Sequence, residues 1–86
     1  MKAFTYDVTD PLGLHARPAG MLTKKAKEYP DTTITITKGA KTVKAAQLMM
    51  LMNLAVKNGD QVTVQAEGPQ EEAAIAAVEA FFKENL

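Results

Sequence analysis

The stretch Thr33-Ile34-Thr35-Ile36-Thr37 decides the fold. Every residue in it is β-branched, and isoleucine alternates with threonine, so one face of the segment is apolar and the other is polar. This period of two predicts a strand that is half buried in a sheet. Lys38-Gly39-Ala40 then predicts a turn, and Lys41-Thr42-Val43 predicts a short edge strand that returns beside the first.

Two further segments alternate in the same way, one at residues 3–8 and one at residues 62–67. The turn sequence Asn58-Gly59-Asp60 precedes the second of them. We therefore expect four strands in all. The apolar residues of these two segments are Phe4, Tyr6, Val8, Val62, Val64 and Ala66.

Three other segments predict helices. Residues 19–29 carry small and apolar side chains at helical spacing and end at Pro30, and residues 45–56 are mostly apolar with no helix breaker. The last helix opens at Gly68-Pro69, with Pro69 at its first position. Its buried stripe is Ile75, Val78 and Phe82, with Phe81 nearby. The order of elements predicts an α+β open-faced sandwich, in which helices cover one face of a four-stranded sheet and a threonine-rich face stays open.

The helix at 45–56 has more apolar residues than one face can bury. Leu51 with Leu54, or Leu51 with Leu48 and Ala55, can face the core, so some of its methionines should be exposed. Two interpretations stay open. The methionines fill a small satellite core with flexible side chains, or they form an adaptable docking surface.

Composition narrows the function. The 86 residues predict one domain, residues 1–86, and there is no cysteine and only one histidine, which argues against disulfides and metal clusters. Ten basic residues balance ten acidic ones, so the charge excess of a nucleic-acid-binding protein is missing. No segment predicts a signal peptide or membrane span. We expect a cytoplasmic monomer that binds no metal and no nucleic acid and inserts into no membrane.

The only histidine lies in Gly13-Leu14-His15-Ala16-Arg17-Pro18-Ala19. Asp10-Pro11-Leu12-Gly13 predicts a turn, so His15 falls where a loop meets the N-terminus of a helix. The first N–H groups of a helix have no internal partner and attract anions. A neutral imidazole there is a nucleophile, and Arg17 is near enough to share the charge of a phosphoryl group. The plainer alternative is a loop histidine that merely caps a helix.

Taken in this order, the sequence resembles the histidine-containing phosphocarrier (HPr) family of the bacterial phosphoenolpyruvate-dependent sugar phosphotransferase system. The resemblance covers the whole chain, and its most specific part is the segment Gly13–Ala19. It implies that Nδ1 of His15 accepts a phosphoryl group from phosphorylated enzyme I and donates it to the IIA domain of a sugar permease. Arg17 would be the charge partner, and the backbone of Ala16 and Arg17 would bind the phosphate. The resemblance also implies the antiparallel strand order 1-4-2-3, with three helices on one side of the sheet.

No cofactor is implied for this chain, since Mg²⁺ and phosphoenolpyruvate would be used by enzyme I. Many members of the family carry a regulatory serine at the start of the second helix, where this chain has Gln47, which has no hydroxyl group. Met50 replaces a glycine of that region. By the same resemblance, the residues around His15 that meet partners would be Ala16, Gly20, Met21, Lys24, Lys27, Leu48, Met49 and Met52.

Two alternatives to a general carrier follow from the sequence. One is a specialised paralogue that serves a nitrogen-regulatory or fructose branch. The other is a regulatory module that binds partners without transferring phosphate, although intact His15 and Arg17 speak against it. Nucleic-acid binding by the open sheet is disfavoured by the neutral charge balance and by an aromatic content of 6%.

Overall fold

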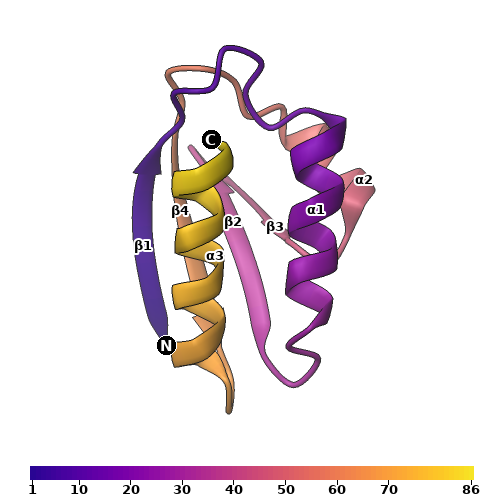
Figure 1. The fold of residues 1–86 in the computed structure, drawn as a ribbon, viewed down its shortest axis with the longest axis vertical. Helices are drawn as coiled ribbons and strands as arrows, with labels where there is room; N and C mark the ends of the chain where they lie inside the picture. Colours follow the sequence, from indigo (N-terminus) through magenta and orange to yellow (C-terminus); the bar gives the residue numbers. More distant parts are fainter.

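The computed structural model describes residues 1–86 and has the predicted order of strands and helices. Figure 1 shows how they are arranged. The elements are β1 (Lys2–Asp7), α1 (Ala16–Lys27), β2 (Thr33–Lys38), β3 (Lys41–Lys44), α2 (Leu48–Leu54), β4 (Gln61–Glu67) and α3 (Glu71–Asn85).

The four strands form one antiparallel sheet in the order β1-β4-β2-β3, as the resemblance implied. The predicted alternation sets the faces of this sheet. Ile34 and Ile36 of β2 are 3% and 0% exposed, and Ile36 lies opposite Val64 of β4 and Val43 of β3. One face of the sheet is therefore apolar across all three of these strands.

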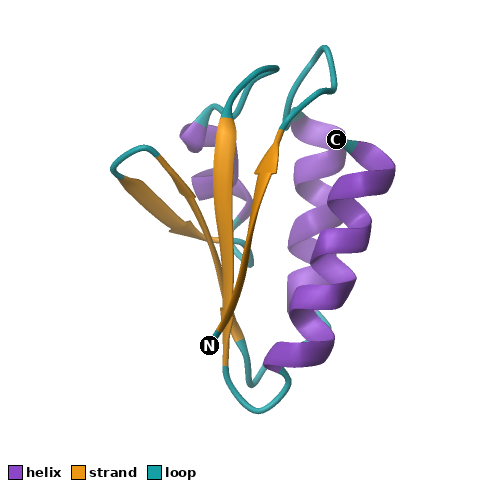
Figure 2. Cartoon of the chain, turned by 90° about the vertical axis from the view of Figure 1, so that its left-hand side faces the viewer, coloured by secondary structure: helices purple, strands orange, loops and turns teal.

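The helices leave the opposite face of the sheet uncovered (Figure 2). The strand register places a row of four threonines on this face, one from each strand. Thr5 pairs with Thr63, Thr63 with Thr37, and Thr37 with Thr42. The hydroxyl oxygens of Thr37 and Thr42 lie 2.8 Å apart, within hydrogen-bonding distance. Threonine suits this position because its branched side chain favours the strand while its hydroxyl remains hydrated.

The helices pack on the apolar face. In Figure 2, α1 and α3 lie side by side against the sheet, and α2 packs on β3 and on α1. Leu51 and Leu54 of α2 join the same buried cluster as the isoleucines of β2, which confirms the one-sided arrangement. At the other edge of the sheet, the ring of Phe82 packs edge-on against Phe4 and Tyr6. None of the three helices combines the length and the apolar character that crossing a bilayer requires.

All three helices differ in their bounds from those predicted. The first was expected at 19–29 and lies at Ala16–Lys27, because the chain is already helical before Pro18, which needs no N–H partner in the first turn. Its end tightens, with Glu28 N–H donating to the carbonyl of Lys25 at 3.1 Å. Helix α3 begins at Glu71 and not at Pro69, which belongs to the preceding turn.

Helix α2 is shorter than the expected 45–56. At its start, the N–H of Ala45 donates to the carbonyl of Ile34 at 2.9 Å, which keeps this residue attached to the sheet. At its end, Ala55 adopts the left-handed conformation (φ 56°, ψ 49°) and turns the chain away. A contact with the sheet therefore limits the start of α2, and the left-handed conformation of Ala55 limits its end.

Candidate functional site

His15 is the N-cap of α1, at the end of the loop that leaves β1. Its backbone is extended (φ −88°, ψ −175°), and its carbonyl accepts the first hydrogen bond of the helix, from Ala19 N–H at 2.9 Å. The imidazole makes no capping hydrogen bond and is half-buried. His15 therefore occupies the capping position that the plainer alternative predicted, but its imidazole is not used for capping.

Two backbone donors stand open beside this ring. The N–H groups of Ala16 and Arg17 make no hydrogen bond in the structure, and Pro18 has no N–H to offer. Open donors at a helix N-terminus stabilise an anion by about 0.3–1 kcal/mol at an exposed site. The helix therefore presents a small anion site with two donors directly after the histidine.

The side chains around His15 form a shallow depression of about 200 Å³. Its lining residues are Asp10, His15, Arg17, Pro18, Met21 and Asn85. Arg17 is exposed and takes part in none of the ion pairs of the chain. The guanidinium is thus available to an incoming phosphoryl group, for which its planar set of donors is well suited.

Two residues of this depression were not predicted. The sequence predicted Asp10 only as a turn residue. Its carboxylate accepts the N–H of Leu12 at 2.8 Å, as in such a turn. Asn85 is brought in by α3, where its side-chain amide donates to the carbonyl of Phe81 at 3.0 Å. No local pattern marks Asn85, because only the packing of α3 over the sheet places it near His15.

The loop before His15 is held against the segment that follows α2. Gly13 N–H donates to the carbonyl of Asp10 at 2.9 Å, and Leu14 N–H donates to the carbonyl of Val56 at 3.0 Å. Leu14 is 5% exposed. Because the backbone of Leu14 is hydrogen-bonded and its side chain is buried, the residue directly before His15 is held in place.

The predicted docking residues lie on two helices that contact each other, α1 and α2. On α1, Ala16, Met21, Lys24 and Lys27 are exposed and Gly20 is half-buried. Neither Lys24 nor Lys27 forms an ion pair. On α2, the exposed apolar residues are Leu48, Met49, Met50 and Met52, at 40%, 71%, 43% and 37%. We call these four the methionine face.

The methionine face contradicts the interpretation of a satellite core, since only Leu51 and Leu54 of α2 are buried. The docking interpretation stays a prediction. Gln47 is the N-cap of α2, is exposed, and makes no capping hydrogen bond with its side chain.

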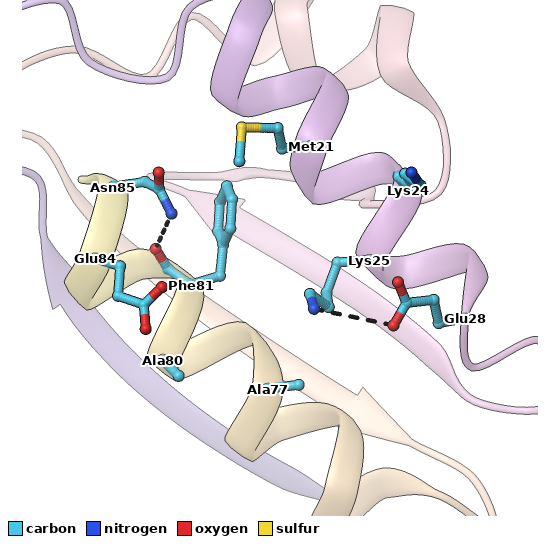
Figure 3. Close-up of a pocket in the computed structure, with 9 residues that line it drawn as sticks. All are labelled: Met21, Lys24, Lys25, Glu28, Ala77, Ala80, Phe81, Glu84 and Asn85. Carbon is cyan, nitrogen blue, oxygen red and sulfur yellow. Dashed lines mark hydrogen bonds and ion pairs between the residues drawn. The ribbon is translucent and has the colours of Figure 1, made fainter.

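A larger groove of about 500 Å³ runs between α1 and α3 (Figure 3). Lys25 and Glu28 face each other there at 3.9 Å, and the ring of Phe81 points toward α1. The groove shares Met21 and Asn85 with the depression at His15 but holds no histidine of its own. Elsewhere in the chain, no three histidine, aspartate or glutamate side chains come together as metal ligands.

Comparison with known proteins relates almost the whole chain to one family. The family model described as the PTS HPr component phosphorylation site matches residues 2–84. The phosphocarrier protein HPr of Mycoplasma genitalium is 32% identical over 85 residues, which cover 99% of this chain and 97% of that protein. Its counterpart in Mycoplasma capricolum is 38% identical over 78 residues, covering 91% and 86%. The solved structure of a mycoplasma histidine-containing phosphocarrier protein superposes with a TM-score of 0.93 at 35% identity, covering 96% and 93% of the two chains.

Proposed function

This chain belongs to the HPr family of phosphocarrier proteins of the phosphotransferase system, and on that premise we propose that His15 is its phosphoryl acceptor and donor. In this proposal Nδ1 of His15 takes the phosphoryl group from phosphorylated enzyme I. The same group then passes to the IIA domain of a sugar permease.

The observation that carries the proposal is the combination of a free imidazole with three open donor groups. These are the backbone N–H groups of Ala16 and Arg17 and the guanidinium of Arg17. During transfer the bond between phosphorus and Nδ1 forms as the bond between phosphorus and the donor breaks, roughly in line. The open donors meet the negative charge that arrives with the phosphoryl group.

The small number of these contacts suits a carrier. The depression is shallow and its donors are at the surface, so each contributes modestly to the free energy of the phosphorylated state. A deep site would hold the group more tightly and slow its departure. We propose that the chain uses no cofactor of its own, and that each partner supplies the rest of the transfer machinery.

We further propose that partners dock across α1 and α2. The methionine face supplies apolar area of the kind that marks interaction sites. Lys24 and Lys27, free of internal ion pairs, would attract acidic partner surfaces and speed encounter, an effect that salt weakens. At the edge of this surface Gln47 has no hydroxyl group, so we propose that regulation by phosphorylation of a serine at this position is lost.

The proposal is tested by intact mass after incubation with enzyme I, Mg²⁺ and phosphoenolpyruvate. The wild type should gain one acid-labile phosphoryl group, and His15→Ala should gain none. Lys44→Ala is a control, because Lys44 is exposed on β3 and lies in none of the ion pairs. No gain by the folded wild type with its own organism's enzyme I would refute the carrier role. It would favour the module that binds partners without transfer.

Arg17→Ala separates charge stabilisation from folding. Because Arg17 is exposed and unpaired, we expect the free energy of unfolding to change by less than about 0.5 kcal/mol. Removal of a donor that meets transition-state charge typically slows a reaction by about 10²-fold or more. Transfer rates that match the wild type, or a variant that unfolds, would contradict this role. Supplying purified IIA proteins from the sugar, fructose and nitrogen branches would then show which of them accepts the phosphoryl group.

A further inference from the structure

Lys38 lies at the end of β2 and forms two strong contacts across the fold. Its Nζ donates to the carbonyl of Ala55 at 2.7 Å and lies 3.0 Å from the carboxylate of Asp60. The two charged side chains are 30% and 32% exposed. An ammonium bonded to both a carbonyl and a carboxylate at this depth restrains both partners.

These two partners are the ends of one short segment, residues 55–60. Ala55 ends α2 in the left-handed conformation. Asp60 closes the other end, where its carboxylate also accepts the N–H of Lys57 at 2.8 Å. The N–H of Lys57, followed by the ammonium of Lys38, lowers the pKa of Asp60, which keeps this carboxylate charged and able to hold both donors. Lys38, which lies outside this segment, therefore links its two end residues, Ala55 and Asp60.

The segment in turn supports the loop that carries His15. The carbonyl of Val56 accepts the N–H of Leu14, the residue before the histidine. The side-chain amide of Asn58 donates to the carbonyl of Thr9 at 3.0 Å. Gly13 lies so close that an added Cβ would be 2.4 Å from the carbonyl oxygen of Val56. The two segments are thus in direct contact along their length.

We propose that Lys38 is a positioning residue for phosphoryl transfer at His15. The inference rests on the proposed function. Lys38 touches neither the imidazole nor the phosphate site, and acts by holding the carbonyl of Val56 where Leu14 can bond to it. Loss of the ammonium loosens residues 55–60, and the N-cap His15 and the open donors of Ala16 and Arg17 lose their alignment. Because the carbonyl of Ala55 directly follows α2, the docking helix and the phosphate site share this support.

The test compares Lys38→Met with Lys41→Met in transfer from phosphorylated enzyme I. Lys41 is the register partner of Lys38 on β3, is exposed, and forms no ion pair, so it controls for the loss of one positive charge. We expect Lys38→Met to lower kcat by about tenfold, a part of the roughly 10²-fold that a misplacement of about 1 Å can cost. Lys41→Met should stay within about twofold of the wild type. Lys38→Arg, which keeps a cationic donor, should recover most of the rate.

Three outcomes would overturn the inference. One is an unchanged kcat in Lys38→Met, whatever its stability. The second is an effect on KM alone, which would make Lys38 a docking residue. The third can be measured even if Lys38→Met is too unstable for kinetics. Amide NMR spectra of the folded variant, recorded at low temperature, would show the signals of Leu14, Ala16 and Arg17 unshifted from those of the wild type. If the wild type itself is not phosphorylated at His15, the proposed function fails first, and the two failures are therefore distinguishable.

Discussion

Gly13 and Gly20 allow the same substitution to be tested with opposite expected signs. Gly13 lies in the loop before His15 with φ +65°, and an added Cβ would lie 2.4 Å from the carbonyl oxygen of Val56 and 2.6 Å from Cα of Lys57. Gly20 lies inside α1, and an added Cβ there meets nothing within 4 Å. Both substitutions add one methyl group, one in the loop before His15 and one inside α1.

For Gly13→Ala two costs add. Forcing backbone atoms apart costs about 1–3 kcal/mol, and a left-handed conformation costs an L-residue about 1–2 kcal/mol. Alanine also makes the unfolded chain less flexible than glycine does, and this offsets about 0.4–1 kcal/mol of the loss in the free energy of unfolding. The net loss in the free energy of unfolding is about 1–4.5 kcal/mol. At about 4–8 °C per kcal/mol for a domain of this size, Tm should fall by roughly 4–36 °C.

For Gly20→Ala only the helix term applies. Alanine is favoured over glycine inside a helix by about 0.5–1 kcal/mol, so Tm should rise by roughly 2–8 °C. Thermal and urea unfolding followed by far-UV circular dichroism measures both variants. A Gly13→Ala protein within about 0.5 kcal/mol of the wild type would show that the loop is not held against residues 56–57. A destabilised Gly20→Ala protein would show that α1 is packed more tightly there than the structure indicates.

Three further substitutions test other features. The hydroxyl of Thr23 is buried without a hydrogen-bond partner. Thr23→Val should therefore raise the free energy of unfolding, measured by urea titration, by about 1 kcal/mol. A lower free energy of unfolding would mean that the hydroxyl forms a hydrogen bond. Ala55 has φ 56°, so Ala55→Gly should stabilise by about 0.5–1 kcal/mol in the same assay, and a destabilised variant would refute the strain. The folded-state pKa of Asp60 is lowered, first by the N–H of Lys57 and then by Lys38. Its contribution to stability is therefore present above the ordinary aspartate range and is lost as the pH falls below that range, through the lowered pKa of the folded state. Chemical denaturation across acidic pH should show wild type more stable than Asp60→Asn at neutral pH and the two converging in acid, whereas a constant difference would exclude this linkage.

The strands were predictable because their signal is local. Alternation of isoleucine and threonine in residues 33–37 sets which side chains face the core, whatever strand lies next to them. Alternation does not say which strands pair. The order β1-β4-β2-β3 was implied only by the resemblance of the whole chain to a family, and the structure agrees.

The helix ends were not predictable for the opposite reason. Residues 45–56 are uniformly good helix formers, yet the helix stops at both ends where other parts of the chain intervene. Ala45 donates to Ile34, and the carbonyl of Ala55 is held by Lys38. Such contacts join residues far apart in sequence and leave no periodic trace in it.

The residues of the candidate site also differ in whether a local sequence signal predicts them. His15 and Arg17 were predicted because their spacing beside a helix start is itself the signal, and the structure leaves both side chains free. Asn85 was missed because it reaches the depression through the packing of α3. The support from Lys38 was missed as well, since a lysine before a turn has the composition of any solvated hairpin.

The position of Leu86 bears on how the protein should be handled in the laboratory. Its carbonyl accepts the N–H groups of Thr9 and Asp10, at the base of the loop that leads to His15. An affinity tag fused after Leu86 would emerge beside the proposed phosphoryl site and, if enzyme I is the donor as proposed, would compete with it for access. Met1 lies at the far end of the molecule, where its ammonium group meets Glu71 at 2.7 Å (Figure 1). A tag fused there disturbs only a surface ion pair, so transfer assays should use N-terminal fusions.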